Sequence, residues 1–389
     1  MATKRPYYEQ VDIENTQRLR ELLAALPPFV KDYFRGIEQV TASRTRIAYA
    51  YDLGIFFNYL ASSNPEIART GIKNLKVDIL DQIALGDLEE YAEYLKYYDK
   101  GDEDHINKER GVKRKLSSLK SFYNYYYRRE IIRTNPAALI ELPKIQEKEI
   151  VRLDPNEVAL LLDAVESGDK LTARQAAFHE KTKVRDLAIL TLLLGTGIRV
   201  SECVGLNITD VDFKNDGIRV HRKGGKEVVV YFGEEVEQAL TAYLEQRKLI
   251  VEADGSEGAL FLSLQNRRIS VRAVENLVKK YSRTVTTLKN ITPHKLRSTY
   301  GTSLYRETGD IYLVADVLGH SDVNTTRKHY AALEDDRRRY ARNKVRLRET
   351  MPERPAEFSR EASRETSSRQ ISASPDSQPA SGNTNEKDS

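Results

Sequence analysis

A histidine and an arginine stand three residues apart in the segment "ITPHKLRSTYGT", residues 291–302. Thr292 is of a type that caps helix N-termini and Pro293 suits the first helical position, so we expect a helix to begin here. At this spacing His294 and Arg297 share one face of the first turns, where the helix dipole and free N–H groups favour an anion. The pair therefore predicts a phosphate-binding site.

The alternative interpretation is that His294 and Arg297 are ordinary surface groups of an amphipathic helix. Leu296, Tyr300 and Leu304 recur at helical spacing and would form its buried stripe. Short motifs often match by chance. The phosphate interpretation therefore depends on further residues that are able to act at the same anion.

Four other segments contain side chains suited to that anion. Arg199 follows a glycine-bracketed turn in "GTGIRVSE", where a side chain is presented at the head of a new helix. His320 follows Gly319, which we expect to end a helix in "LGHSD". Lys223 lies at the tip of a predicted hairpin, and Tyr330 follows a turn region in "TTRKHYAAL".

Other classes of site find little support in the sequence. It contains no CxxC pair, no HExxH and no DxDxDG loop, so we expect no metal. Cys203, the single cysteine, lies in the apolar context "RVSECVGL", where we expect it to pack as a small hydrophobe. "GTGIRV" matches only part of a dinucleotide loop, because Val200 replaces the third glycine. We therefore expect no nucleotide cofactor and no cofactor of another kind.

Taken in order, "GTGIRVSE", "RKGGKE", "TPHKLRST" and "LGHSDVNTTRKHY" resemble the catalytic domain of the tyrosine site-specific recombinases, and most closely the Xer branch. The preceding helical region resembles the family's core-binding domain in size and position. The resemblance implies an active site made of Arg199, Lys223, His294, Arg297, His320 and Tyr330.

The spacing of the last residue departs from the commonest Xer pattern. Tyr330 lies ten residues after His320, where nine is usual, and His329 occupies the expected place. A one-residue insertion in the turn accounts for the difference. Tyr340 is the near alternative for the nucleophile.

The resemblance implies a metal-free transesterification. Arg199 and Arg297 would offer planar forks of donors to the non-bridging oxygens and stabilise the charge of the transition state. Tyr330 would attack to give a 3′-phosphotyrosyl link, and Lys223 would protonate the departing 5′-oxygen. His294 and His320 would add hydrogen bonds or accept the tyrosine proton.

Glu202 stands three residues after Arg199 on the same expected helix face. It is either the group that orients Arg199 or an ordinary surface glutamate.

Length and composition limit the class of protein. The 389 residues exceed one ordinary core, so we expect two domains. No stretch approaches the ~20 apolar residues of a membrane helix, and charged sequence follows the N-terminus in place of a signal peptide, so we expect a cytoplasmic protein without membrane contact. The formal net charge of +4 is compatible with a polyanionic partner.

The first half of the chain has helical periodicity. We expect an N-terminal helical arm over 1–28, with its helix over 11–25, and a helical core-binding domain over 29–142. Two buried stripes are expected to repeat at helical spacing: Ile47, Tyr51, Ile55 and Tyr59, and Val112, Leu116, Leu119, Tyr123 and Tyr126. The second helix also carries basic residues, which are either a solvated face or a DNA-binding face: Arg110, Lys113, Arg114, Lys115 and Lys120, with Arg128 beyond them.

The second half is expected to be mixed. A proline-containing linker over 143–155 leads to a catalytic domain over 156–347 with a β-hairpin at "GIRVHRKGGKEVVVYF", where Gly224 and Gly225 permit a tight turn. Helices are expected over 270–285, 293–306 and 310–318. Residues 348–389 are rich in Ser, Glu, Arg and Pro and are predicted to be a disordered tail. The fold class is therefore mostly α with a small β-sheet.

These expectations describe a recombinase that acts on double-stranded DNA at a specific site, with two domains that clamp the duplex. The resemblance implies a homotetramer on two sites and, most simply, Xer-like chromosome dimer resolution. The last helix, "RRRYARNKVRLRE", is expected to pack into a neighbouring protomer. Alternatives in the same family are a mobile-element integrase or excisionase and a DNA invertase. A type IB topoisomerase or a non-catalytic DNA-binding protein are the rivals outside it.

Overall fold

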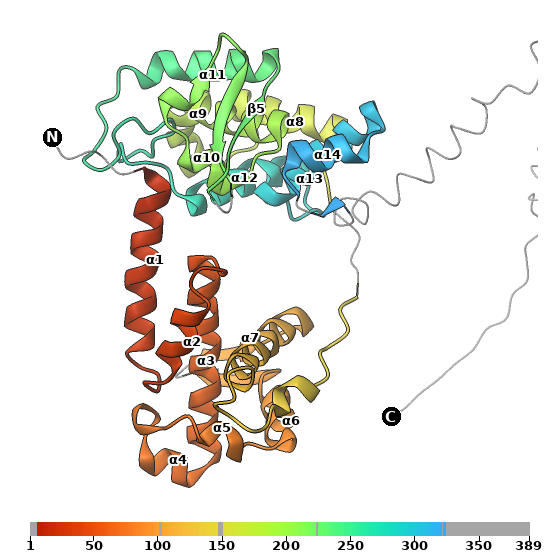
Figure 1. Cartoon of the computed structure of the whole chain (residues 1–389). Coiled ribbons are helices and arrows are strands. Elements are labelled where there is room, and N and C mark those ends of the chain that lie inside the picture. Colours follow the sequence, from red (N-terminus) through yellow and green to blue (C-terminus); the bar gives the residue numbers. More distant parts are fainter. Residues whose placement is uncertain (1–5, 101–102, 147–150, 223–224, 321, 324–389) are drawn as a thin grey trace, which may run out of the picture. The chain divides into compact units, whose positions relative to one another are not determined.

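The N-terminal part of the chain is helical. The computed structural model describes residues 6–100, 103–146, 151–222, 225–320 and 322–323, and all of them fall in the unit that spans Met1–His329. Among the described residues of this part, seven segments are α-helices (Figure 1): α1 (Tyr7–Leu23), α2 (Val30–Gly36), α3 (Ser43–Ser63), α4 (Pro65–Thr70), α5 (Ile79–Gln82), α6 (Leu85–Tyr94) and α7 (Glu109–Tyr127). Short 3-10 turns follow α4 at Ile72–Asn74 and α7 at Pro136–Leu139 (η2).

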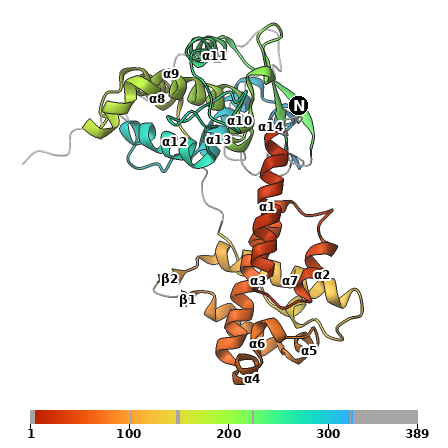
Figure 2. The same ribbon diagram turned by 90° about the vertical axis from the view of Figure 1, so that its left-hand side faces the viewer.

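A two-stranded antiparallel hairpin precedes α7 (Figure 2). Its strands are β1 (Tyr97–Lys100) and β2 (Glu103–Ile106), and Tyr97 pairs with Ile106. The sequence did not predict this hairpin.

Aromatic side chains fill the core of the helical part. Phe122 of α7 is fully buried and lies edge-on to Phe57 of α3, with ring centroids 6.2 Å apart. The stripe predicted for α7 is confirmed, because all five of its residues are buried: Val112, Leu116, Leu119, Tyr123 and Tyr126. The same core begins with α1 at Leu19 and ends near Ile140.

The stripe predicted for α3, Ile47, Tyr51, Ile55 and Tyr59, is confirmed only in part. Tyr59 is buried in the core and the half-buried Ile47 and Ile55 pack against it, but Tyr51 is 41% exposed. The buried face instead runs through Leu53, Phe56, Phe57 and Leu60. A strict four-residue step advances about 40° around a helix at each repeat, so the predicted row winds off the buried face.

The second half combines helices with a small sheet. Its helices are α8 (Pro155–Ser167), α9 (Ala173–Thr196), α10 (Val200–Gly205), α11 (Glu234–Arg247), α12 (Val271–Val285), α13 (Pro293–Thr308) and α14 (Ile311–Leu318), with a 3-10 turn at Ile208–Asp210. The strands β3 (Val211–Asp212), β4 (Gly217–His221) and β5 (Glu227–Tyr231) form one antiparallel sheet in the order β3-β4-β5. The predicted hairpin is confirmed, with His221 opposite Glu227. Gly225 has a φ of 77°, as the predicted tight turn requires, whereas Gly224 lies outside the described residues.

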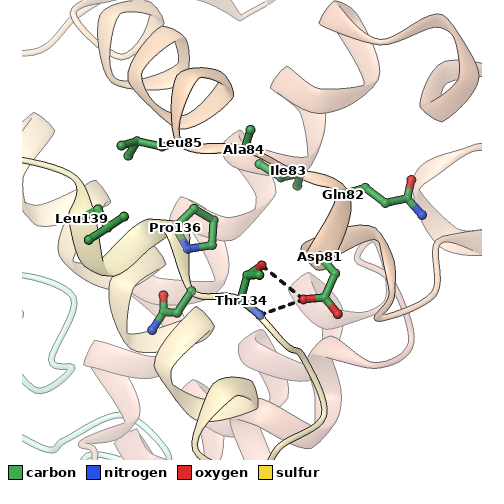
Figure 3. A pocket seen from close by; sticks show the side chains of 9 residues that line it. Asp81, Gln82, Ile83, Ala84, Leu85, Thr134, Pro136 and Leu139 are labelled. Atoms are coloured by element: carbon green, nitrogen blue, oxygen red, sulfur yellow. Dashed lines mark hydrogen bonds between the residues drawn. The ribbon is translucent and has the colours of Figure 1, made fainter.

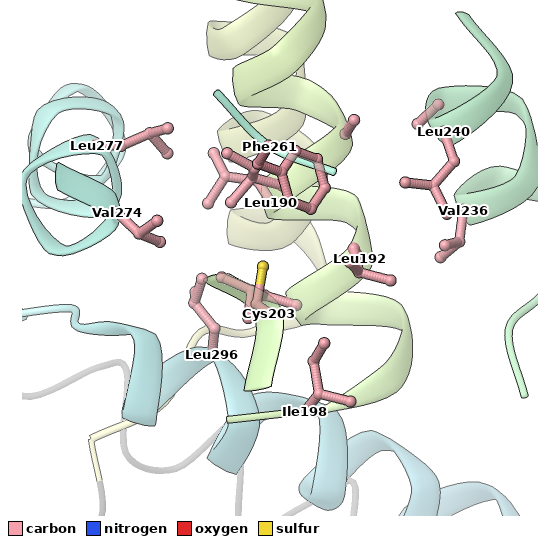
Figure 4. Close-up of a cluster of buried hydrophobic side chains, with 14 of the residues drawn as sticks. Leu190, Leu192, Ile198, Cys203, Val236, Leu240, Phe261, Val274, Leu277 and Leu296 are labelled. Atoms are coloured by element: carbon pink, nitrogen blue, oxygen red, sulfur yellow. The ribbon is translucent and has the colours of Figure 1, made fainter. Parts of the chain in front are cut away.

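A separate apolar core surrounds α9 (Figure 4). Leu190 and Leu192 of α9, Cys203 of α10 and Leu296 of α13 are all fully buried in it. Burial raises the pKa of Cys203 to about 12, and the nearby Glu202 carboxylate adds to the rise. The prediction that Cys203 packs as a small hydrophobe is confirmed.

Helix ends near the predicted site follow the sequence signals. α13 begins at Pro293 and α14 ends before Gly319, whose φ is 61°. One detail differs, because Thr292 occupies the N-cap position of α13 but its side chain makes no capping hydrogen bond. The predicted fold class, mostly α with a small β-sheet, is confirmed, and the hairpin of β1 and β2 adds a second small sheet. Within the described ranges no helix is both long and apolar enough to cross a membrane.

Two predictions for the C-terminal region cannot be compared with the structure. The expected last helix and the expected disordered tail both lie outside the described residues. The predicted domain boundaries stay a prediction, although the two apolar cores fall on either side of the expected linker over 143–155.

Candidate active site

Arg199 is held by an acidic partner on its own helix. Glu202 accepts hydrogen bonds from the backbone N–H of Arg199 and from its Nη1, both at 2.8 Å. The Glu202 side chain is 4% exposed, while that of Arg199 is 39% exposed. Glu202 is therefore a buried anchor that orients Arg199, and the interpretation of Glu202 as a surface glutamate is wrong.

Arg297 enters the protein interior, which also excludes the surface interpretation for this residue. It is 4% exposed, and its Nη1 donates to the carbonyl oxygen of Gly197 at 2.5 Å. Its Nη2 donates to the carbonyl oxygen of Leu318 at the end of α14. A buried guanidinium is stable only where its donors are matched in this way. Arg297 thus connects α13 to the C-terminal ends of α9 and α14.

The C-terminal turn of α14 is where the two arginines meet. Arg199 Nη2 donates to the Gly319 carbonyl oxygen at 3.3 Å, next to the Leu318 carbonyl that Arg297 contacts. Gly319 has the left-handed conformation that ends the helix, and the N–H of His320 then donates to the Ala315 carbonyl oxygen at 2.9 Å. The turn therefore places His320 directly after the peptide groups that anchor Arg199 and Arg297.

Gly197 is a second glycine that the site requires. It ends α9 with a φ of 62°, and a Cβ at this position would overlap the Tyr300 ring of α13 and approach Leu318. Its carbonyl oxygen accepts from Arg297. The close approach of α9 to α13 at Gly197 thus permits the contact that fixes Arg297.

The two predicted histidines differ in their surroundings from Arg297. His294 is exposed on the first turn of α13, and His320 is half-buried after α14.

The stripe proposed as the alternative for α13 is only partly buried, because Leu296 is fully buried whereas Tyr300 and Leu304 are half-buried.

Two predicted site residues, Lys223 and Tyr330, lie outside the described residues. The residue before Lys223 is described. Arg222 donates from Nη2 to the Val317 carbonyl oxygen at 2.6 Å, so the end of β4 lies at the same turn of α14. The structure thus brings Arg199, Arg297, His320 and Arg222, at the end of β4, to the same turn of α14.

Sequence reasoning missed the acceptors of this site. The carbonyl groups of Val317, Leu318 and Gly319 each accept from a different arginine. Side-chain motifs do not reveal backbone acceptors, and the glycine after an apolar run was the only available signal. Arg222 was also missed, although its place beside Lys223 in the expected turn was visible in the sequence.

The basic residues predicted on α7 are not equivalent. Arg110 is exposed and Lys113 is half-buried, whereas Lys115 is buried and its Nζ donates to Asn107 Oδ1 at 2.8 Å. Lys120 Nζ donates to the Ala138 carbonyl oxygen at 3.1 Å.

Arg114, whose side chain is 48% exposed, forms an ion pair with a buried carboxylate. Its two Nη groups donate to the two carboxylate oxygens of Asp52 at 2.5 and 2.7 Å, and Asp52 is 2% exposed. Burial raises the pKa of Asp52, and the Arg114 guanidinium opposes that rise. Arg114 and Lys115 therefore have clear structural partners in the helical part.

A second basic face, on α12, was not predicted. Its buried side consists of Val274, Leu277, Val278 and Tyr281. Its exposed side consists of Arg272, Asn276, Lys279 and Arg283, at steps of four, three and four residues. These are side-chain types that contact phosphates and base edges of DNA.

A pocket lies in the helical part (Figure 3). It has a volume of about 380 Å³ and lies where the end of α5 meets the segment before η2. Asp81, on its wall, accepts from the N–H groups of Arg133 and Thr134 and from the Thr134 hydroxyl. In the part of the chain that the structure describes, no three His, Cys, Asp or Glu side chains are grouped to hold a metal ion.

Similar sequences point to one family. Residues 151–337 match the model of the phage integrase family. The tyrosine recombinase XerC of Caldanaerobacter subterraneus subsp. tengcongensis is 33% identical over 329 residues, which cover 82% of this chain and 86% of that protein. The tyrosine recombinase XerS of Streptococcus uberis is 30% identical over 349 residues, which cover 83% of this chain and 96% of that protein.

Solved structures share the fold. The XerH site-specific recombinase in a post-cleavage complex with a palindromic difH substrate is similar with a TM-score of 0.57 and 19% identity, covering 88% of this chain and 97% of that chain. The Tn1549 transposon integrase in complex with circular intermediate DNA is similar with a TM-score of 0.55 and 23% identity, covering 77% and 93%. The sequence relatives, which this chain covers over most of their length, show that it belongs to the phage integrase family and, within it, to the Xer-like tyrosine recombinases.

Proposed function

We propose that this enzyme is a site-specific recombinase that cleaves and rejoins duplex DNA through a 3′-phosphotyrosyl intermediate. The observation that carries the proposal is the convergence of Arg199 and Arg297 on adjacent carbonyl groups, with His320 as the next residue. Two guanidinium groups anchored at neighbouring carbonyl groups offer donors suited to the two non-bridging oxygens of a phosphodiester.

The cleavage step is a transesterification. The hydroxyl oxygen of Tyr330 forms a bond to the scissile phosphorus, and the bond from phosphorus to the 5′-oxygen breaks. The proton of the tyrosine passes to His294 or His320, and Lys223 donates a proton to the departing 5′-oxygen. Arg199 and Arg297 stabilise the additional negative charge of the transition state. A 5′-hydroxyl from a partner strand reverses the step, so strand exchange needs no nucleotide cofactor.

DNA contacts are proposed on both halves of the chain. On α7 the proposal rests mainly on Arg110 and Lys113, because Arg114 and Lys115 already have structural partners and Lys120 contacts a carbonyl group. On α12 it rests on the exposed Arg272, Lys279 and Arg283. Basic helices of this kind bind the phosphate backbone, and a few of their side chains read base edges.

We further propose that four protomers assemble on two DNA sites in the cytoplasm and act in chromosome dimer resolution. The similarity to XerC and XerS proteins over most of their lengths supports this role. The transposon integrase among the similar structures keeps integration or excision of a mobile element as the second candidate.

Covalent trapping tests the chemistry. A binding site is first selected from a random duplex library with the full chain and is then built into a nicked substrate whose cleavage cannot be reversed. Wild-type protein is expected to give an SDS-stable adduct at the 3′ side of the break, Tyr330→Phe none, and Tyr340→Phe the wild-type amount. An adduct that persists in Tyr330→Phe and disappears in Tyr340→Phe would move the nucleophile to Tyr340.

Assays of the same purified protein distinguish the rival activities. A type IB topoisomerase would relax any supercoiled plasmid and give no recombinant product from a plasmid that carries two selected sites. A non-catalytic DNA-binding protein would shift the selected duplex on a gel without any adduct. Recombination between two selected sites, lost in Tyr330→Phe, is the result that we expect.

A further inference from the structure

Arg222 joins the hairpin to the end of α14. Its Nη2 donates to the Val317 carbonyl oxygen at 2.6 Å, and its Nη1 to the Asp316 carbonyl oxygen at 3.3 Å. The backbone of Arg222 also closes the hairpin, because its N–H donates to the Lys226 carbonyl oxygen at 2.8 Å and its own carbonyl accepts from Gly225 at 3.2 Å. Arg222 therefore fixes both the strand pairing at the end of β4 and the place of this strand end against α14.

The contact has a clear electrostatic basis. The last carbonyl groups of a helix have no partner within the helix and carry the negative end of its dipole. The Arg222 guanidinium meets two carbonyl groups of this last turn with adjacent donors, as its planar fork allows, and one of them, that of Asp316, also accepts from the Gly319 N–H at 2.8 Å. Gly319 provides the room, because a Cβ at that position would overlap this guanidinium.

Arg222 belongs to a row of contacts along one turn. The carbonyl of Val317 accepts from Arg222, that of Leu318 from Arg297 and that of Gly319 from Arg199. Arg199 and Arg297 belong to the candidate active site, and Arg222 is the residue immediately before Lys223 in the sequence. The strand that leads to Lys223 is thus anchored to the same turn as the two arginines.

We propose that Arg222 is a positioning residue, which fixes the hairpin at the turn of α14 so that Lys223 reaches the departing 5′-oxygen. This inference rests on the proposed function, in which Lys223 is the general acid. Successive Cα atoms are about 3.8 Å apart, so a fixed Arg222 limits where Lys223 starts. Misplacement of a catalytic group by about 1 Å is enough to cost roughly 10²-fold in rate.

A change of leaving group isolates this role. Two nicked substrates are compared, one with the normal 5′-bridging oxygen at the scissile phosphate and one with sulfur in its place. The thiolate leaves without a proton, since a thiol has a pKa of about 8.5 whereas water, like an alcohol, lies near 15.7. A defect in proton donation therefore slows cleavage of the oxygen substrate and spares the sulfur substrate.

For Arg222→Ala we expect cleavage of the oxygen substrate to slow by about 10- to 100-fold, because a misplaced general acid loses only part of the roughly 10²- to 10⁴-fold that general acid catalysis contributes. Cleavage of the sulfur substrate should stay within about threefold of wild type. Lys223→Ala should show the same selective loss, at least as large. Arg219→Ala is the matched control, because it removes an arginine from the same strand, one that pairs with Asp210 and not with α14. Arg219→Ala should cleave both substrates at wild-type rates.

The outcomes separate the inference from the proposed function. In one outcome Lys223→Ala cleaves the sulfur substrate at the wild-type rate, but Arg222→Ala cleaves both substrates equally slowly or both at the wild-type rate. The positioning role of Arg222 is then overturned, and the assignment of Lys223 as the general acid stands. If Lys223→Ala is equally slow on both substrates, the assignment of Lys223 fails and the inference fails with it. Thermal unfolding checks that each variant is folded, and Arg222→Lys, which keeps one cationic donor, replaces Arg222→Ala in the comparison if the alanine variant does not fold.

Discussion

Arg199 and Arg297 donate to neighbouring carbonyl oxygens of one chain turn, Gly319 for Arg199 and Leu318 for Arg297. The two arginines come from helices that are separated by about a hundred residues, and neither contact follows from local sequence. The turn acts as a common anchor for both guanidinium groups. Its geometry depends on Gly319, because the left-handed conformation there costs roughly 1–2 kcal/mol for a residue with a side chain.

Removal of the Arg297 guanidinium should affect both stability and cleavage. Arg297→Ala leaves the carbonyl groups of Gly197 and Leu318 without this donor in the interior, at a cost of about 1–3 kcal/mol in the free energy of unfolding for a buried group left unpaired. We expect the single-turnover cleavage rate to fall by about 10²- to 10³-fold, as for loss of one donor to a transition-state charge. Urea unfolding and the suicide substrate measure the two effects.

The control for Arg297 lies on the same helix. Arg306 is exposed in the last turn of α13, and Arg306→Ala removes an equal charge without a buried contact. Wild-type cleavage by Arg297→Ala, with a normal response of the control, would contradict the assignment of Arg297 to the active site.

Glu202 should act on cleavage through Arg199. Glu202→Gln keeps the size of the side chain but removes the charge and one of the two acceptors that hold Arg199. We expect the cleavage rate to fall by about 10-fold or more because Arg199 is less well placed, while the affinity for the selected DNA changes little. Glu180→Gln is the control, since Glu180 is an exposed glutamate with an i,i+3 partner, Lys183. Equal loss of affinity and rate in Glu202→Gln would contradict a positioning role.

The sequence predicted the elements that carry the site better than the contacts within it. Gly319 after an apolar run and Pro293 after Thr292 marked the ends of α14 and α13, because these signals are local. The burial of Arg297 and the role of Arg222 were not predictable in this way. Both depend on carbonyl groups that lie far away in the sequence, and a motif gives no information on which donor meets which acceptor.

The basic face of α7 shows the same limit. Arg110, Arg114 and Lys115 are equivalent as charges in a sequence, but Arg114 meets a buried carboxylate and Lys115 is itself buried. The acidic partner, Asp52, lies on a helix whose predicted stripe was wrong at the neighbouring Tyr51 and did not include the buried residues beside it. The error on α3 therefore concealed the structural role of Arg114.

Arg114 and Arg110 should separate stability from DNA binding. Arg114→Ala leaves the Asp52 carboxylate buried without its partner, and we expect a loss of about 1–3 kcal/mol in the free energy of unfolding. The double variant Asp52→Asn with Arg114→Ala should recover part of that loss, since the buried charge is gone. Arg110→Ala, from an exposed position, should leave stability unchanged and weaken binding to duplex DNA in a salt-dependent manner. A stable Arg114→Ala protein would refute the structural role of the ion pair.

Glu252 gives the second half of the chain a pH-dependent contribution to stability. Its carboxylate accepts from the Gly258 N–H at 3.0 Å and from Arg247 Nη1 at 3.3 Å. The backbone hydrogen bond from Gly258, with help from Arg247, lowers the pKa of Glu252 from 4.5 to about 2. A carboxyl group with a lowered pKa in the folded state stabilises above its unfolded pKa and loses that contribution as the pH falls through its folded pKa.

The variant Glu252→Gln tests this contribution, because the glutamine side chain has the shape of a protonated glutamate but cannot ionise. It should be less stable than wild type at pH 7, and the difference in the free energy of unfolding should shrink between about pH 4.5 and pH 2, the interval that the two pKa values define. Urea unfolding at several pH values measures this difference. A difference that stays constant down to pH 2 would show that the carboxylate charge contributes nothing and that the loss at pH 7 comes from the shape or hydrogen bonding of the amide.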